Sequence, residues 1–122
     1  MRLWHEKLIP ELPRQQLLGQ HRECCALRGL GWEKKHETVG YVFQYSPYKL
    51  YQYHMKVINE MKARSYENDP LWELPTYRGE SCPPYDLAEI KKVKETKPIY
   101  PEHDTEYMKK CICNLLVKGV LI

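Results

Sequence analysis

The segment that most constrains the fold of this 122-residue chain is Pro13–Arg28, PRQQLLGQHRECCALR. Its residues predict one helix, because the fixed φ of Pro13 suits the first helical position and its missing N–H would be unpaired there. Gly29 and Gly31 follow, and glycine accepts a left-handed helix cap at little cost. A stripe at helical spacing is expected to face the core, made by Leu17, Leu18, His21, Cys24 and Cys25.

The polar side of this helix carries Gln16, Gln20 and Glu23, which lie within about 60° of one another at roughly 100° per residue. Gly19 lies one turn before Glu23, and helical side chains lean toward the N-terminus, so Glu23 covers a residue without a side chain. A helical glycine costs about 1 kcal/mol relative to alanine and usually has a reason. Two reasons stay open: another helix packs closely on Gly19, or a ligand needs the room beside Glu23.

Two further helices are predicted. Ser46 is an N-cap residue before Pro47, and this helix should end near residues 64–66. Its apolar stripe is Leu50, Tyr51, His54, Val57, Ile58 and Met61. His54 is expected to be a hydrogen-bonded core histidine, with a functional role as the alternative. Pro101 should open the third helix and Gly119 should end it, with a stripe of Tyr107, Met108, Cys111, Ile112, Leu115 and Leu116.

The connections are long. Residues 1–12 are too few for a helix of their own but apolar enough to lie on the body of the protein, and residues 39–43 have some strand character in a loop. Four prolines make residues 68–85 an irregular crossover, with one turn near 71–74, and residues 86–95 are read as a short charged helix. The sum is one all-α domain, residues 1–122, of three main helices with long irregular connections.

Composition narrows the possible functions. Lys and Arg number 19 against 16 Asp and Glu, so the net charge of +3 permits a nucleic-acid partner without demanding one. Five cysteines, an odd number, with no signal peptide or long apolar run predict an intracellular protein with reduced thiols. No C-x-x-C pair occurs, so core cysteines are expected and no metal site.

The stretch RLWHEKLIPELPRQQLLGQHRECCALRG resembles the pyrimidine-dimer DNA glycosylase family of the endonuclease V type, and most of all its bacterial branch. Gln15, Arg22 and Glu23 stand where that family carries a glutamine, an arginine and its essential glutamate. The resemblance continues by pattern through residues 46–66 and is weak after Asn68.

The resemblance implies a DNA repair glycosylase with AP (β-elimination) lyase activity on damaged pyrimidines, with pyrimidine dimers as the first expectation and no cofactor. The family's nucleophile is the N-terminal α-amine, whose reference pKa of about 8 leaves a useful neutral fraction. It therefore implies Met1 as nucleophile and Glu23 as acid/base. The implied DNA contacts are Arg2, Gln15, Arg22, Lys34 and Lys35. The implied partner is double-stranded damaged DNA, bound by a monomer in the bacterial cytoplasm at the nucleoid, away from membranes.

The chain departs from the family pattern at three places. Arg2 follows Met1 where the phage pattern has a small residue, so a retained Met1 would present the amine. Ala26 stands where the family has a second arginine, and Arg28 is a candidate replacement. The chain ends in GVLI where the family has an aromatic and basic tail, which leaves dimer specificity open.

Two alternatives to the enzyme stay open. The first is a non-catalytic DNA-binding module of the same fold, in which Arg22 and Glu23 are an exposed pair on a helix surface. The second is a protein-interaction domain that would use the three tryptophans, Trp4, Trp32 and Trp72, as contacts.

Overall fold

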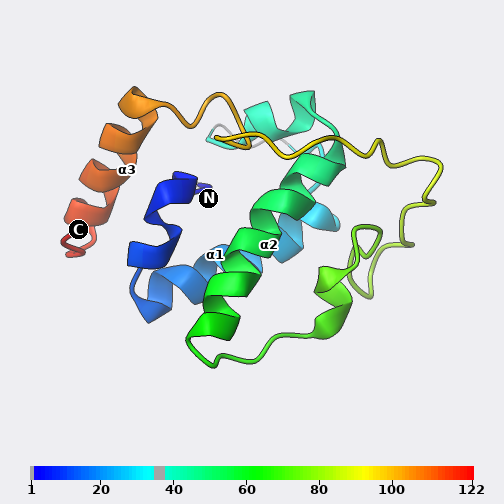
Figure 1. Cartoon of the computed structure of the whole chain (residues 1–122), viewed down its shortest axis with the longest axis horizontal. Coiled ribbons are helices and arrows are strands. Elements are labelled where there is room, and N and C mark those ends of the chain that lie inside the picture. The colour runs from blue at the N-terminus through cyan, green and yellow to red at the C-terminus, as the bar shows by residue number, and fades with distance from the viewer. Residues whose placement is uncertain (1, 35–37) are drawn as a thin grey trace.

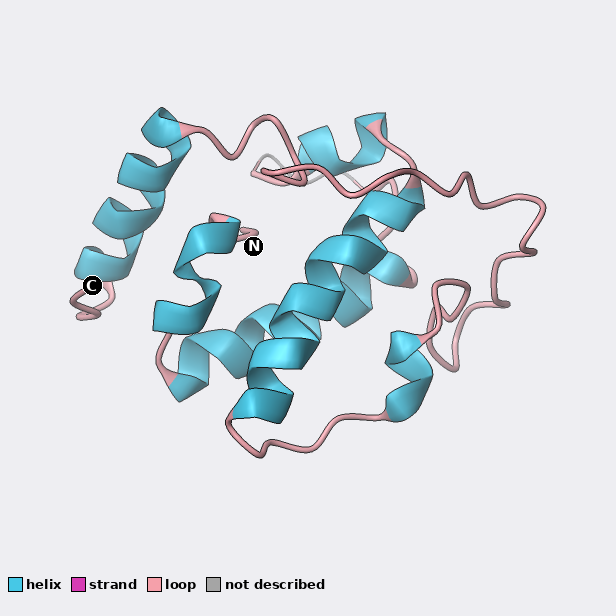
Figure 2. Cartoon of the chain, viewed as in Figure 1, coloured by secondary structure: helices cyan, strands magenta, loops and turns pink. Residues whose placement is uncertain are grey.

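The computed structural model describes residues 2–34 and 38–122. Its elements in chain order are η1 Glu6–Glu11, α1 Arg14–Arg28, η2 Gly40–Gln44, α2 Pro47–Ala63, η3 Pro70–Glu73 and α3 Thr105–Val117. Figure 1 shows α1 and α2 packed at the centre, with η1 between them and α3. Helices and loops make up the described residues, without a strand (Figure 2). The predicted all-α fold with three long helices and irregular connections is confirmed.

The ends of α1 and α2 follow the residues that predicted them. Pro13 occupies the N-cap position and its carbonyl accepts the first helical bond from Leu17 N (3.0 Å), so α1 begins one residue later than expected. The Ser46 side chain accepts from Tyr48 N at 3.2 Å, and α2 begins at Pro47 as predicted. None of the described helices is long and apolar enough to cross a membrane.

The core lies between α1, α2, η1 and α3. Most predicted stripe positions are buried, among them Leu17, Cys24, Leu50, His54, Val57, Ile58, Met61, Cys111 and Leu115. Leu18, His21, Cys25 and Tyr51 are half-buried, and Leu116 is 48% exposed. Tyr53, which lies off the predicted stripe of α2, is also fully buried.

Two predictions for the first half of the chain are wrong in part. Residues 6–11 do form a helix, the 3-10 helix η1, because Leu8 and Ile9 are buried on the body and the His5 side chain accepts from Lys7 N at its start. Packing supplies what so short a helix lacks by itself. The segment with strand character is instead the 3-10 helix η2, in which Val42 is buried.

The third helix starts later than predicted. It begins at Thr105 rather than Pro101, because Asp104 is the N-cap residue and its Oδ1 accepts from Tyr107 N at 2.9 Å. The predicted end is close, since Lys118 is the C-cap and Gly119 follows with a φ of +81°.

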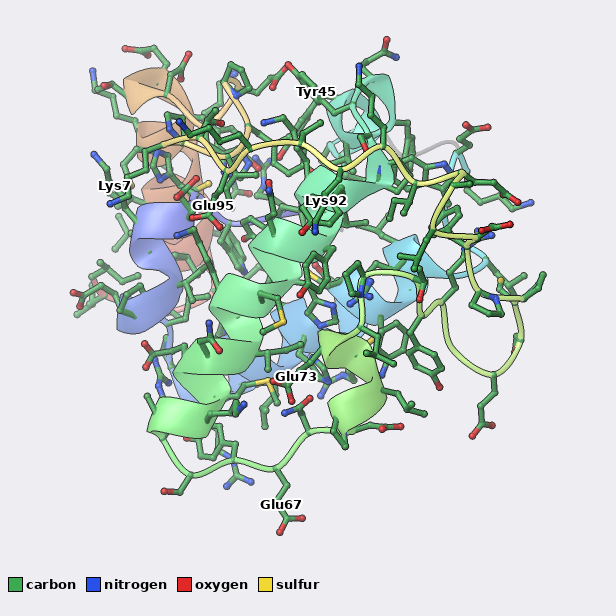
Figure 3. All side chains as sticks on the ribbon, turned by 45° about the vertical axis from the view of Figure 1, so that its right-hand side comes forward. Lys7, Tyr45, Glu67, Glu73, Lys92 and Glu95 are labelled. Carbon is green, nitrogen blue, oxygen red and sulfur yellow. The ribbon has the colours of Figure 1, made fainter. Side chains whose placement is uncertain are left out.

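The predicted helix over residues 86–95 is wrong. A single turn at 87–89 is followed by an extended segment that runs along α2. Side chains of α2 take its backbone carbonyls, since Gln52 Nε2 donates to Val93 O at 2.8 Å and the Ser46 hydroxyl donates to Lys91 O. Glu95 also lies 3.8 Å from Lys56 of α2 (Figure 3).

The crossover is irregular as predicted, with η3 as its one helical turn, and it is fixed to the body of the protein. Glu73 of η3, which is labelled in Figure 3, pairs with Lys62 of α2 at 2.9 Å. The buried guanidinium of Arg28 donates to three crossover carbonyls, those of Trp72 (2.8 Å), Leu74 (2.7 Å) and Tyr77 (3.1 Å). Arg78 donates in return to the carbonyls of Arg28 (3.0 Å) and Gly29 (3.2 Å).

Candidate active site

Glu23 lies half-buried on α1 at the edge of a small pocket of about 230 Å³. The pocket is lined by Arg2, Trp4, Glu23, Thr38, Asn114 and Lys118. Segments far apart in sequence therefore meet here: the N-terminal segment, α1, and the last turn of α3.

The N-terminal segment is held beside Glu23 by Gln20, a side chain only 1% exposed. Its Oε1 accepts from Trp4 N at 2.7 Å, and its Nε2 donates to Arg2 O at 3.0 Å and to Glu23 Oε2 at 3.0 Å. The same amide therefore contacts the backbone on both sides of Leu3 and the carboxylate of Glu23.

Two tyrosines complete the attachment of this segment. The Tyr53 hydroxyl of α2 lies 2.5 Å from Trp4 O and 2.9 Å from Gln20 Oε1, two acceptors that share its proton. The Tyr107 hydroxyl of α3 donates to Leu3 O at 2.5 Å. The sequence analysis missed this use of Gln20 and of both tyrosines. A tyrosine hydroxyl at a buried helix position needs a partner, and that need was the available signal.

The electrostatics of Glu23 reflect this setting. Partial burial raises its pKa above the ordinary value, while hydrogen bonds from Arg2 N–H and the Gln20 amide, and the charge of Lys118, oppose the rise. Because burial prevails, the side chain holds its proton to higher pH than an exposed glutamate does. A carboxyl group of this kind is a candidate both to donate and to accept a proton.

An exposed stripe adjoins Glu23 on α1. Gln15, Gly19, Arg22 and Ala26 follow the spacing i, i+4, i+7, i+11, and all but the half-buried Gly19 are exposed. A Cβ built on Gly19 would meet only Arg22 Nη2, at 3.7 Å. Close packing of a helix is therefore not the reason for this glycine. The space above Gly19 opens to solvent beside Arg22 and Glu23.

The remaining expected residues are placed differently. Arg2 is half-buried, with its guanidinium over the Tyr107 ring of α3, 5.6 Å from the ring centroid. Lys34 is exposed in the turns that follow α1. Met1 and Lys35 lie outside the described residues.

Arg28 does not take the place of an arginine at position 26. Its side chain leaves α1 about 120° away from that of Arg22, points into the core and is 4% exposed. Its donors are committed to the crossover carbonyls and to His54 Nδ1 (2.9 Å). Of the four residues of the exposed stripe, Gln15, Gly19, Arg22 and Ala26, Arg22 is the one that carries a positive charge.

A second polar cluster lies on the opposite side of α1, where ligand atoms of His21, Cys25 and His54 lie within 4.8 Å of one another. Arginine can only donate, so His54 Nδ1 accepts from Arg28 and the His54 proton is on Nε2. That proton points at His21 Nδ1, 2.8 Å away. To bind a metal ion here, both His54 Nε2 and His21 Nδ1 would have to offer a lone pair, but His54 Nε2 carries a proton. The ion would also lie beside the buried, positively charged guanidinium of Arg28. The cluster is accordingly a hydrogen-bond network between α1 and α2, in keeping with the core role expected of His54.

The Cys25 thiol is no nucleophile either, because burial raises its pKa to about 12.

The three tryptophans are engaged within the molecule. Trp4 is 7% exposed. Trp32 packs edge-on against Phe43 with ring centroids 4.9 Å apart, and Trp72 packs in the same way against Tyr77 at 4.8 Å. Their packing gives no support to a surface built on tryptophan contacts.

Comparison with known proteins bears on this site directly. A protein-family model described as pyrimidine dimer DNA glycosylase matches residues 1–74, which is more than half of the chain. The chain belongs to the pyrimidine dimer DNA glycosylase family. No curated protein and no solved structure matches it. The family is one of DNA repair glycosylases, so DNA is the class of substrate. The matched region contains η1, α1 with Glu23, α2 and η3, whereas α3 and its Tyr107 lie beyond it.

Proposed function

We propose that this pyrimidine dimer DNA glycosylase family member is a DNA glycosylase with AP lyase activity on damaged pyrimidines, acting through an imine on its N-terminal amine. The observation that carries the proposal is the link that Gln20 makes between the N-terminal segment and Glu23: its amide donates to Arg2 O at 3.0 Å and to Glu23 Oε2 at 3.0 Å. Bond lengths alone keep the α-amine of residue 1 within about 4 Å of the Arg2 nitrogen. This short distance supports the proposal that the N-terminal amine and the Glu23 carboxyl group act in one site.

The chemistry follows from these two groups. The neutral amine forms a bond to C1′ of the damaged nucleotide as the bond from C1′ to the base breaks, and the departing base takes up a proton. Opening of the sugar gives the imine, and removal of a proton from C2′ then expels the 3′ phosphate and nicks the strand. Glu23 is the group proposed to stabilise positive charge on the sugar and to move these protons.

The exposed stripe on α1 supports the proposed DNA contacts. Arg22 makes no ion pair with the residues that the structure describes, so its charge is available to a phosphate. Gly19 and Ala26 are small neighbours on the same stripe, which lets a DNA backbone approach the helix closely. Gln15 lies two turns before Arg22, and Arg2, Lys34 and Lys35 complete the proposed set. Enzymes that act on a base in a duplex take a base out of the stack, and we expect the same here.

The proposal is tested by borohydride trapping. Tag-free protein is incubated with a duplex that contains one abasic site, borohydride is added, and a covalent protein–DNA band is sought. We expect the band with the wild type and with Glu11→Gln, a change at an exposed glutamate of η1. We expect a strongly reduced band with Glu23→Gln and with one residue added before Met1.

Failure of the wild type to form a band, while it still retards DNA in a gel at low salt, would favour the non-catalytic DNA-binding module. Failure to bind DNA at low salt would favour a protein-interaction domain. If the band forms, incision of a duplex with one cyclobutane pyrimidine dimer tests the expected lesion, and an equal rate on undamaged DNA would contradict it.

A further inference from the structure

Gln20 uses the whole hydrogen-bonding capacity of its side chain. A carboxamide offers two acceptor lone pairs on oxygen and two N–H donors on nitrogen. In this site the oxygen meets Trp4 N–H and the Tyr53 hydroxyl, and the nitrogen meets Arg2 O and Glu23 Oε2. The Gln20 side chain is only 1% exposed, and a buried polar atom without a hydrogen bond costs free energy. These four contacts avoid that cost.

Only one orientation of this amide satisfies its neighbours. Trp4 N is a donor and must face the oxygen, whereas Arg2 O and the Glu23 carboxylate are acceptors and must face the nitrogen. A flipped amide would place its oxygen against two acceptors and its N–H groups against a donor. The neighbours therefore fix the Gln20 side chain, and it in turn fixes where the Arg2 peptide lies relative to the Glu23 carboxylate.

We propose that Gln20 is a positioning residue for the reaction, which sets the separation between the N-terminal amine and the carboxyl group of Glu23. The inference rests on the function proposed above, because positioning has a meaning only for a reaction that uses both groups. Gln20 itself touches no substrate. It acts through the two backbone groups of the N-terminal segment and through the one carboxylate oxygen that it binds.

The identity of residue 20 matters as much as its size. Glutamate has nearly the same shape but would set a second carboxylate against Glu23 and against Arg2 O, where two acceptors already lie. Methionine has a similar length and fills the same space without donating a hydrogen bond. These two substitutions therefore distinguish the effect of the volume of the Gln20 side chain from the effect of its hydrogen bonds.

The experiment compares Gln20→Met and Gln20→Glu with Gln16→Met, a half-buried glutamine one turn earlier on α1. Each variant is followed by trapping rate at saturating abasic-site DNA, by affinity for that DNA, and by carboxyl NMR titration of Glu23 in the free protein. For Gln20→Met we expect a fall of roughly tenfold to a hundredfold in the saturated trapping rate, because displacing a reacting group by about 1 Å slows a reaction by about that factor. We expect its DNA affinity to stay close to that of the wild type.

The NMR titration provides the readout that a merely structural role would not move. Loss of the Gln20 donor should shift the Glu23 midpoint to higher pH, and Gln20→Glu should shift it further, with the pH profile of trapping moving in the same direction. Gln16→Met should change none of these quantities. Urea unfolding identifies any variant that does not fold, and Gln20→Glu, which retains the Oε1 acceptor, carries the test if Gln20→Met fails to fold.

Two outcomes are distinguished. A wild type that forms no imine removes the proposed function, and the positioning role falls with it. A wild type that forms the imine, together with folded Gln20 variants that trap at the wild-type rate and leave the Glu23 midpoint unmoved, overturns the positioning role alone.

Discussion

Arg22 and Glu23 are neighbours in sequence, but the helix turns their side chains into different surroundings. Arg22 is exposed on a stripe with Gln15 and Ala26, whereas Glu23 is half-buried at the pocket and hydrogen-bonded by Gln20. A rotation of about 100° per residue is enough to separate the proposed phosphate contact, Arg22, from the proposed proton-transfer group, Glu23. The two proposed roles therefore follow from the different surroundings of two neighbouring residues. The stripe lacks the second arginine of the family, because Ala26 occupies that position.

The exposed alanine on this stripe gives the first prediction. Ala26→Arg should strengthen DNA binding, because it adds a cation one turn from Arg22 at a position with no core contact. One added phosphate contact should steepen the dependence of log K on log salt by about 0.9 and strengthen binding by at most about tenfold at 0.1 M salt.

Fluorescence anisotropy with a labelled abasic duplex over a salt series measures this effect. The matched control is Ala63→Arg, at an exposed alanine that ends α2. An equal change in the salt slope for both variants would show that net charge, rather than this stripe, governs binding.

At the scale of elements, α1 is joined to the crossover by a buried cation. Arg28 binds three carbonyls of residues 72–77, and its guanidinium lies 5.0 Å from the Trp72 ring centroid. It also donates to His54, so one side chain connects α1, α2 and the crossover. A long crossover, which its prolines predict to be irregular, is in this way attached to α1 and α2.

The second prediction concerns this attachment. Arg28→Met should lower the free energy of unfolding by roughly 3 kcal/mol, because it leaves several buried carbonyls without donors. Urea unfolding followed by circular dichroism measures the loss, and limited proteolysis should cut residues 75–85 faster in the variant. Arg22→Met is the control, with an expected change within about 0.5 kcal/mol. Equal stabilities for the two variants would contradict the structural role of Arg28.

At the scale of the whole molecule, folding buries most of the histidines. Burial lowers the pKa values of His5, His21 and His54, and that of His103 falls to about 3. Each of these groups is a base whose pKa is lower in the folded state than the ordinary 6.5. The unfolded chain therefore binds more protons than the folded protein below that pH, and stability is lost as the pH falls.

The third prediction follows from this sign. The free energy of unfolding should be highest above about pH 7 and should decrease progressively from about pH 6.5 toward pH 4. Glu23 acts in the opposite direction, because its raised pKa favours the folded state at low pH, but a single partly buried group does not offset four histidines. Urea unfolding at half-unit pH steps measures the profile. His21→Gln should flatten it, and an unchanged stability between pH 7 and pH 5 would contradict the burial of neutral histidines.

Local sequence signals were enough to predict the ends of the first two long helices, most of their buried positions and the protein family. Ser46 with Pro47, and Pro13 with Gly29, marked the ends of α1 and α2 to within a residue or two, because helix ends depend on backbone groups that only nearby side chains can satisfy. The 3.6-residue period identified most of the buried stripe and placed Glu23 on the polar side of α1 together with Gln20. The resemblance of residues 2–29 then indicated the family that the comparison confirmed.

The tertiary structure alone decided how the site is held. Gln20 binds Arg2 across 18 residues, Tyr53 binds Trp4 across 49, and Tyr107 binds Leu3 across 104. No local pattern encodes such pairs, because each depends on where several helices bring distant backbone groups. The same reason explains why the carbonyls of residues 91–93 bind α2 instead of forming a helix of their own. The sequence by itself determined the helices and the chemical groups they present, and only their packing decided which of those groups meet at Glu23.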